Sequence, residues 1–171
     1  MPVEEQLLND TTMWRYTNDD GRQGQKLTIP NRTVTKLAFL LLHRGTPPGN
    51  ATFTIRKVSD DDVIVSKIWG LVNDLPLGAT WEEVEFDTPA TIDEEVRIAV
   101  EYTGHTLNNE IGVRYQASDV KATEVYTRWM DPVWQDEVWD CAYKYTWDEP
   151  SAGLENKSAN MGAKMVAGKL I

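Results

Sequence analysis

Side chains between Ala79 and Tyr102 alternate between apolar and polar, and this pattern constrains the fold of the 171-residue chain more than any other feature. Successive side chains of a β-strand face opposite sides of a sheet, so the alternation predicts strands with one buried face. Proline cannot donate a hydrogen bond to a sheet, so Thr88-Pro89 is expected to end a first strand and to form a turn before a second. We therefore predict two adjacent strands of an antiparallel β-sandwich. Their apolar faces consist of Val84 and Phe86, and of Val96, Ile98, Val100 and Tyr102.

Short alternating or apolar runs recur along the whole chain, with clusters of Gly, Pro, Asn and Asp between them. About nine or ten short strands at regular spacing predict an all-β protein, and an antiparallel jelly-roll-type β-sandwich of about 8–10 strands with N- and C-terminal arms fits best. A closed barrel is the alternative. Strands are expected at residues 13–16, 25–29, 33–43, 51–56, 63–71, 111–117, 123–129 and 138–147, and a loop at residues 130–137.

The chain length suits one domain with short arms. We expect an N-terminal arm at residues 1–11, a β-sandwich domain at residues 12–149 and a C-terminal arm at residues 150–171. Residues 151–171 carry three lysines and one glutamate, so the C-terminal arm is basic on an acidic body and could either dock on a neighbouring copy or be solvated. The expected contacts of the arms are Leu7, Leu8, Met161, Met165, Leu170 and Ile171.

The stretch Thr33 to His43 is apolar on both faces. Such a strand is either covered on both sides within its own domain or lies at an interface. Leu40 and Leu42, on the face opposite to Leu37, are therefore candidates for contact with a second copy.

The formal net charge of −10 makes nucleic acid and anionic membranes unfavourable partners. The first ten residues lack the basic and apolar regions of a Sec signal, and no run approaches the roughly 18 apolar residues of a transmembrane helix. We expect a protein that is cytoplasmic when synthesised and that reaches a virion or an extracellular surface without a Sec signal.

Nothing in the sequence reads as a catalytic motif. The two histidines, His43 and His105, lie near no nucleophile or metal-ligand pattern. Glu83 and Glu85 fall on the expected solvent face of their strand, where charge is common. The single cysteine, Cys141, falls on an apolar face and is expected to be buried and inert. We therefore expect a protein that is not an enzyme and that needs no cofactor.

Two turns rich in oxygen ligands, Asp60-Asp61-Asp62 and Asn18-Asp19-Asp20-Gly21, raise a calcium-binding hypothesis. Neither turn matches an EF-hand loop, and solvated turns are the preferred interpretation.

Tryptophan is abundant, with seven residues, and aromatic rings stack on sugars and anchor protein interfaces. Trp129 and Trp134 flank a short segment that contains Asp131, and Asp136 follows. Aromatic rings beside carboxylates suit a sugar platform, and they also suit a lid over one end of the sandwich. The lid is the preferred interpretation.

Several strand signatures together resemble jelly-roll β-sandwich modules of phage and virion structural proteins and of bacterial surface carbohydrate-binding modules. The resemblance covers roughly residues 20–147 and implies a fold rather than a set of site residues. It rests on Gly24-Gln25, the 34–42 strand, Gly-Thr-Pro-Pro-Gly before Ala-Thr-Phe-Thr-Ile, Asp74-Leu75-Pro76, Thr80-Trp81, Val-Arg-Ile-Ala-Val-Glu-Tyr and Asp140-Cys-Ala-Tyr-Lys-Tyr.

From these features we expect a structural or interaction protein that self-associates or binds other virion proteins, as in a virion decoration, tail or fibre component. A carbohydrate-binding module that binds glycan through Trp129 and Trp134 is the alternative.

Overall fold

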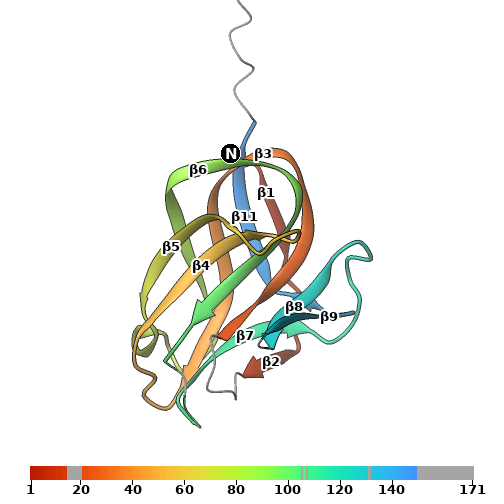
Figure 1. Cartoon of the computed structure of the whole chain (residues 1–171). Coiled ribbons are helices and arrows are strands. Elements are labelled where there is room, and N and C mark those ends of the chain that lie inside the picture. Colours follow the sequence, from red (N-terminus) through yellow and green to blue (C-terminus); the bar gives the residue numbers. More distant parts are fainter. Residues whose placement is uncertain (15–20, 105, 107, 131, 150–171) are drawn as a thin grey trace, which may run out of the picture.

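Two long antiparallel strands, β3 (Gly21–Arg44) and β6 (Thr80–Tyr102), run through the whole molecule (Figure 1). The computed structural model describes residues 1–14, 21–104, 106, 108–130 and 132–149. The register of the two strands extends from Gly21 opposite Tyr102 to Leu41 opposite Thr80. Because each strand bends midway, its two halves belong to different sheets, and the two sheets share one continuous ladder.

The first sheet, called sheet I, contains the first half of β3 and the second half of β6. The second sheet, sheet II, contains their other halves, with β11 and β7 beside β3, β1 on β11, and β2 and β10 on β7. Sheet I is completed by β4 (Asn50–Lys57), β5 (Val63–Leu71), β8 (Val125–Met130) and β9 (Val133–Glu137). The bounds in sheet II are β1 (Val3–Gln6), β2 (Thr11–Trp14), β7 (Glu110–Gln116), β10 (Asp140–Cys141) and β11 (Tyr143–Asp148).

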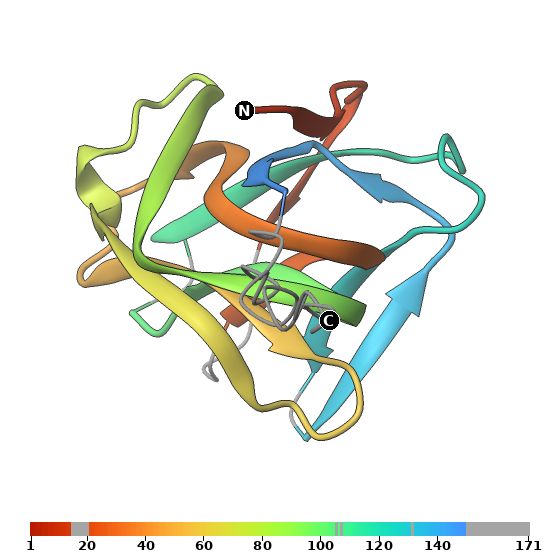
Figure 2. The same cartoon turned by 90° about the horizontal axis from the view of Figure 1, so that it is seen from above.

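All pairings between named strands in the described part of the chain are antiparallel, so the prediction of an all-β antiparallel sandwich is confirmed. Seen from above, β3 and β6 pass between the side that carries β4 and β5 and the side that carries β1 and β11 (Figure 2). The main strand path runs β1-β11-β3-β6-β4-β5 and ends at β1 and β5. The jelly-roll order of strands stays a prediction. A single turn of 3-10 helix, η1 (Val72–Asp74), precedes β6.

The predicted strand break between residues 29 and 33, at Pro30-Asn31, and the turn predicted at Thr88-Pro89 are both wrong, because these segments lie inside continuous strands. At the first, the register shifts between Ile29 and Arg32. Asn31 there takes a left-handed φ of 43°, and its backbone N–H donates to the Asp93 carboxylate at 2.9 Å. The side chain of the opposing strand thus replaces a ladder partner, and the strand bends without ending.

Pro89 lies in the second irregularity of the same ladder. The β6 partner of Val34 is Ala90, whereas the partner of Lys36 is Glu85, so the segment 86–89 stands opposite a single residue. A proline is tolerated at such a bulge because no regular ladder donor is required there. The two irregularities mark where both strands pass from one sheet to the other, as expected at a sandwich corner.

The core fills the space between the two sheets. Leu37, Phe39 and Leu41 of sheet II are fully buried, as are Phe53 and Ile55 of sheet I. Phe39 and Phe53 meet edge to face across the sandwich, with ring centroids 5.3 Å apart. Cys141 is buried and free, as predicted.

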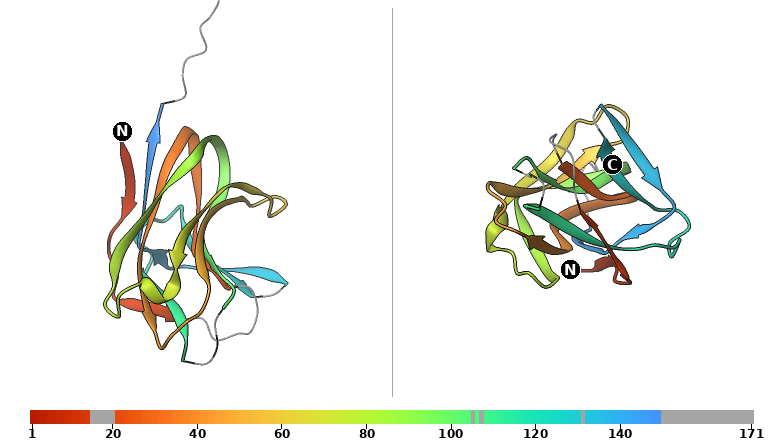
Figure 3. Two further views of the ribbon diagram at one scale, coloured as in Figure 1. Left: turned by 90° about the vertical axis from the view of Figure 1, so that its left-hand side faces the viewer. Right: turned by 90° about the horizontal axis from the view of Figure 1, so that it is seen from below.

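Two further predictions need correction. The loop predicted at residues 130–137 is wrong for residues 133–137, because Val133–Glu137 forms β9 and pairs with β8. The predicted last strand is divided at Ala142 into β10, which pairs with β7, and β11, which pairs with β3. The predicted N-terminal arm contains β1, which lies along β11 (Figure 3, left), while the C-terminal arm lies outside the described residues.

Gly24 offers a test of the shared ladder. A Cβ on Gly24 would collide with the backbone carbonyl of Ile98 on β6, and that backbone is held on both sides by other strands. We expect Gly24→Ala to lower the free energy of unfolding by about 3 kcal/mol, the upper part of the range for overpacking. Gly78→Ala is the control, since its Cβ would meet no atom within 4 Å, and should change stability by less than about 0.5 kcal/mol. Urea denaturation measures both, and equal effects would contradict the shared-ladder account.

Candidate functional site

Trp129 and Trp134 lie opposite each other on the β8–β9 hairpin, with ring centroids 5.6 Å apart at an interplanar angle of 71°. The guanidinium of Arg22 stacks over Trp129 at 4.8 Å, and that of Arg97 stacks over Trp134 at 5.0 Å. We call these four residues the tryptophan face. One side of each indole is therefore in contact with a cation of sheet I, an arrangement that stabilises both partners.

The tip of the β4–β5 hairpin closes onto the tryptophan face through Asp61. Trp134 Nε1 donates to one carboxylate oxygen of Asp61 at 2.8 Å, and Arg22 Nη1 donates to the other at 2.7 Å. Arg56 donates to the Asp61 carbonyl at 2.7 Å. Figure 3 (left) shows the β4–β5 hairpin curving toward the side on which β8 and β9 lie. These bonds join the tips of the β4–β5 and β8–β9 hairpins.

Asp136, the predicted acidic partner of the tryptophans, accepts hydrogen bonds from Lys26 and, at 2.7 Å, from Thr127 Oγ1. Burial opposes its ionisation, but these bonds and the charges of Lys26 and Arg97 outweigh burial and lower the pKa of the carboxyl. Both carboxylate oxygens thus have protein partners. Of the residues predicted for a ligand site, Trp129, Trp134 and Asp136 all lie on the β8–β9 hairpin, while Asp131 lies outside the described residues.

Sequence reasoning missed Arg22, Arg97 and Asp61 as members of this site, because no local pattern links them to the tryptophans. They lie on β3, on β6 and in the β4–β5 turn, more than thirty residues from Trp134 along the chain. The alternation of side chains along its strand predicts that Arg97 points away from the core. It does not predict that the indole ring of Trp134 covers the Arg97 side chain.

The calcium hypothesis finds no support in the described residues, among which no group of three or more His, Cys, Asp or Glu side chains is placed to hold a metal ion. Asp60 instead accepts the backbone N–H of Asp62 at 3.0 Å, and Asp61 binds Arg22 and Trp134. Residues 18–20 of the other turn lie outside the described residues.

Glu83 and Glu85 of β6 form surface ion pairs with Lys36. Lys36 Nζ lies 3.1 Å from Glu83 and 3.5 Å from Glu85, whose side chains are half or more exposed. The hydrogen bond to Glu83 raises the pKa of Lys36. His43 is buried at the end of β3, and His105 lies outside the described residues.

A row of apolar side chains covers the outward side of sheet II. Leu40 pairs with Trp81 on β6, and Leu42 pairs with Gly112 on β7, which in turn pairs with Trp14 on β2. All four large side chains are half-buried, whereas Leu37, Phe39 and Leu41 on the other side of the same strand are fully buried. We call Trp81, Leu40, Leu42 and Trp14 the apolar strip.

Gly112 lets the strip pack closely. A Cβ at this position would lie 2.7 Å from Thr12 Cγ2 and 3.0 Å from both Leu42 Cδ2 and a ring carbon of Trp14. A cation stacks on the tryptophan at each end of the strip: Lys144 lies 4.5 Å from Trp81, and Arg44 lies 4.7 Å from Trp14. The prediction that Leu40 and Leu42 share the face opposite to the core agrees with this register.

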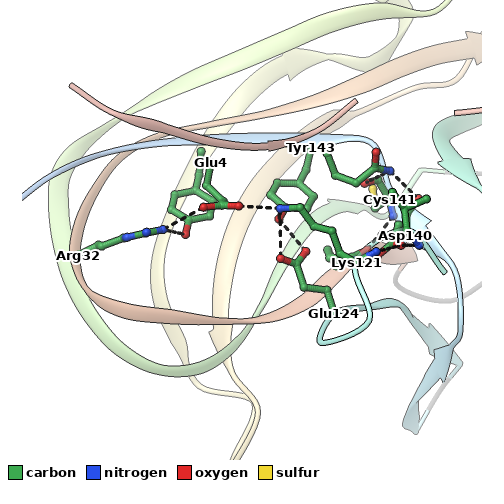
Figure 4. A network of polar contacts seen from close by, with 11 residues as sticks. Glu4, Arg32, Lys121, Glu124, Asp140, Cys141 and Tyr143 are labelled. Atoms are coloured by element: carbon green, nitrogen blue, oxygen red, sulfur yellow. Dashed lines mark hydrogen bonds and ion pairs between the residues drawn. The ribbon is translucent and has the colours of Figure 1, made fainter. Parts of the chain in front are cut away.

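A polar network holds β1 against the sandwich (Figure 4). Glu4 accepts a hydrogen bond from Lys121 Nζ at 2.7 Å and one from Arg32 at 3.4 Å. Lys121 also donates to the hydroxyl of Tyr143 at 2.9 Å, and that hydroxyl donates to Glu124 at 2.7 Å. The network therefore joins β1, β3, β11 and the segment before β8.

Gln6 is the second anchor of β1 and is 3% exposed. Its Nε2 donates to the carbonyls of Asp140 and Cys141, both at 3.3 Å, and to that of Leu8 at 2.9 Å. The carboxylate of Asp140 accepts a hydrogen bond from Gln25 Nε2 at 2.6 Å. It also accepts hydrogen bonds from the backbone N–H groups of Val120 and Lys121, in the segment before β8. We call the groups that bind Glu4 and Gln6 the β1 socket, formed by Arg32, Lys121, Asp140 and Cys141.

Charge and burial act in opposite directions on the two glutamates of this network. Burial opposes ionisation of Glu4, but Lys121 and Arg32 outweigh it and lower the pKa. Burial raises the pKa of Glu124 despite bonds from Tyr143 and Lys121. Burial also raises the pKa of Tyr143 and of Cys141, so the phenol and the thiol stay protonated at neutral pH.

The assembly residues predicted in the N-terminal arm, Leu7 and Leu8, follow β1 and are 44% and 58% exposed. Met161, Met165, Leu170 and Ile171 lie outside the described residues. The β1 socket was missed, although alternation within Val3–Gln6 already sets Glu4 and Gln6 on one face.

Searches against protein-family models and curated proteins find no match to the chain. Within the described residues no helix is long and apolar enough to cross a membrane.

The two glutamates predict opposite pH effects. Because Glu124 has a raised pKa in the folded state, its contribution to stability is present below its unfolded pKa and is lost as pH rises through the folded value. Glu4, with a lowered pKa, contributes stability above its unfolded pKa that is lost as pH falls. In the wild type, the free energy of unfolding should fall as pH rises toward neutral because of Glu124, and this fall should be absent in Glu124→Gln. It should also fall as pH is lowered because of Glu4, and this second fall should be absent in Glu4→Gln. The free energy of unfolding measured between pH 3 and pH 8 tests this, with the exposed Glu94→Gln as control.

Proposed function

We propose that this chain is a structural protein that self-associates and is not an enzyme. The apolar strip on sheet II is the observation that supports this most directly. The setting that the sequence resemblance implies is a virion, in which the chain would be a decoration, tail or fibre component. The terminal arms, including Met161, Met165, Leu170 and Ile171, would add contacts to neighbouring copies.

The strip has the composition of an interface centre. Two tryptophans and two leucines lie in one row across four strands, and aromatic anchors of this kind dominate the energetics of protein contacts. Copies of a chain with a net charge of −10 repel one another. Lys144 and Arg44 at the two ends of the strip are paired with Glu5 and Glu110 of the same chain, so these cations are compensated within the chain.

The double variant Leu40→Lys/Leu42→Lys tests the proposal. Two lysines in the centre of an interface would each lose hydration without a partner, so we expect the oligomer to dissociate to monomer at micromolar concentration. Sedimentation velocity or mass photometry measures this. The control is Ile68→Lys on β5, which is 59% exposed and lies on sheet I. A wild-type chain that is monomeric under all conditions, or an oligomer that tolerates the double variant, would overturn the role of the strip.

The second candidate is a carbohydrate-binding module, which the pair Trp129–Trp134 beside Asp136 favours. Each indole has one side stacked on arginine, and the two indoles meet edge to face, so a sugar would stack on the indole surface that these contacts leave open.

A glycan array with the wild-type protein tests this second candidate. We expect Trp134→Ala to abolish binding and Trp134→Phe to retain part of it, because phenylalanine keeps an aromatic face but loses the N–H that binds Asp61. Thermal unfolding of both variants separates loss of binding from loss of folding. Absence of binding to any glycan by the folded wild-type protein would remove the candidate.

A further inference from the structure

We infer that Lys67 protects the free edge of strand β5 from pairing with an extended strand of another chain. β5 ends the strand path on the sheet I side and pairs with β4 only, within the described part of the chain (Figure 1). This edge lies on sheet I and the apolar strip on sheet II. Protection of the edge therefore holds whether or not the chain self-associates through the strip.

The edge of β5 has the composition of a segment that pairs readily. Its nine residues, Val63–Leu71, include no proline, and Lys67 is the only charged residue among them. The apolar side chains of Val63, Ile68 and Leu71 are exposed. A long apolar strand with unpaired N–H and C=O groups is a template for a second chain. Such an edge is an aggregation site unless a structural feature prevents the pairing.

Two irregularities shorten the regular part of this edge. The register of β5 against β4 shifts twice, and each shift leaves one residue of β5 without a partner on β4: Ile64 near one end and Trp69 near the other. Bulges of this kind bend the strand and interrupt its row of N–H and C=O groups. The longest regular stretch is therefore Val65–Ile68. An added strand would have to pair with this stretch, and Lys67 lies within it.

Lys67 points toward the core side of the sandwich. It stands directly opposite Phe53, which is fully buried, and opposite residues of an antiparallel pair share a face. The Lys67 side chain is 35% exposed, and its Nζ lies 2.6 Å from each carboxylate oxygen of Asp87 on β6. A strand added to β5 would place its own side chain beside Lys67 on this face. The ammonium would then leave water without gaining a new partner, which opposes the pairing.

The variant Lys67→Thr tests this role. Threonine is uncharged, suits a strand and is polar, so the change removes the charge without adding a large apolar side chain. We expect the full-length variant to form sheet-like aggregates at least about tenfold faster than the wild type, because edge pairing no longer buries an ammonium. Thioflavin fluorescence and light scattering measure the rate, and urea denaturation checks that the variant is folded. If threonine destabilises the fold, Lys67→Gln replaces it with the same expectation.

Two control variants separate the charge of Lys67 from its other properties. Lys36 also pairs with carboxylates of β6, but its strand is paired on both sides, so Lys36→Thr removes a similar lysine away from an edge. Asp87→Asn breaks the ion pair and leaves the Lys67 ammonium in place. We expect both controls to aggregate no faster than the wild type. Faster aggregation of either control, or a Lys67→Thr chain as soluble as the wild type, would overturn the role of Lys67.

Hydrogen exchange identifies the strand that pairs in the aggregates. The backbone N–H groups of Val65–Ile68 that point away from β4 should exchange more slowly in Lys67→Thr aggregates than in the soluble wild type, because the added strand accepts them. The amides of β3 and β6 should keep their native protection, which shows that folded chains have assembled. Aggregates in which Val65–Ile68 exchanges as fast as in the soluble protein would overturn pairing at this edge.

Discussion

The backbone ladder between β3 and β6 is the constraint on which the rest of the structure depends. Both strands bend at register irregularities and contribute to both sheets, so the position of one sheet fixes that of the other. Buried backbone groups must be paired, and here the ladder resumes on both sides of the two irregularities at the corner of the sandwich. The core between the sheets, including the contact of Phe39 with Phe53, forms only when this ladder has the correct register.

The two outward faces use this scaffold differently. On sheet I, Arg22, Arg97 and Asp61 occupy the polar positions, and the tryptophans pack over them, so charge is compensated within the chain. On sheet II, Leu40 and Leu42 occupy the corresponding positions and no such layer of ion pairs covers them in the described part of the structure. A face whose charges are paired within the chain has less to gain from a partner, whereas exposure of an apolar face to water costs free energy.

Alternation predicted the strands and their faces well, because a buried face imposes its own period on the sequence. It placed Leu40 and Leu42 opposite the core and Cys141 inside it. It failed at Pro89, because a proline ends a strand only where a ladder donor is needed, and that depends on the partner strand. It missed β9, because Val133–Glu137 is a short and mostly polar segment that becomes a strand by pairing with β8. Contacts such as that of Arg97 with Trp134 depend on how β6 and the β8–β9 hairpin are arranged in space. The alternation of residues within one strand does not contain that information.

The register of β1 shows how a four-residue strand can be specific. Main-chain pairing with β11 would tolerate a slip of one residue, but a slip would turn Glu4 and Gln6 away from the socket and present Val3 and Glu5 in their place. Val3 has no group for Lys121, and Glu5 would bring a carboxylate toward the carbonyls that now accept Gln6. The side chains of Glu4 and Gln6 therefore select one register of β1 on β11.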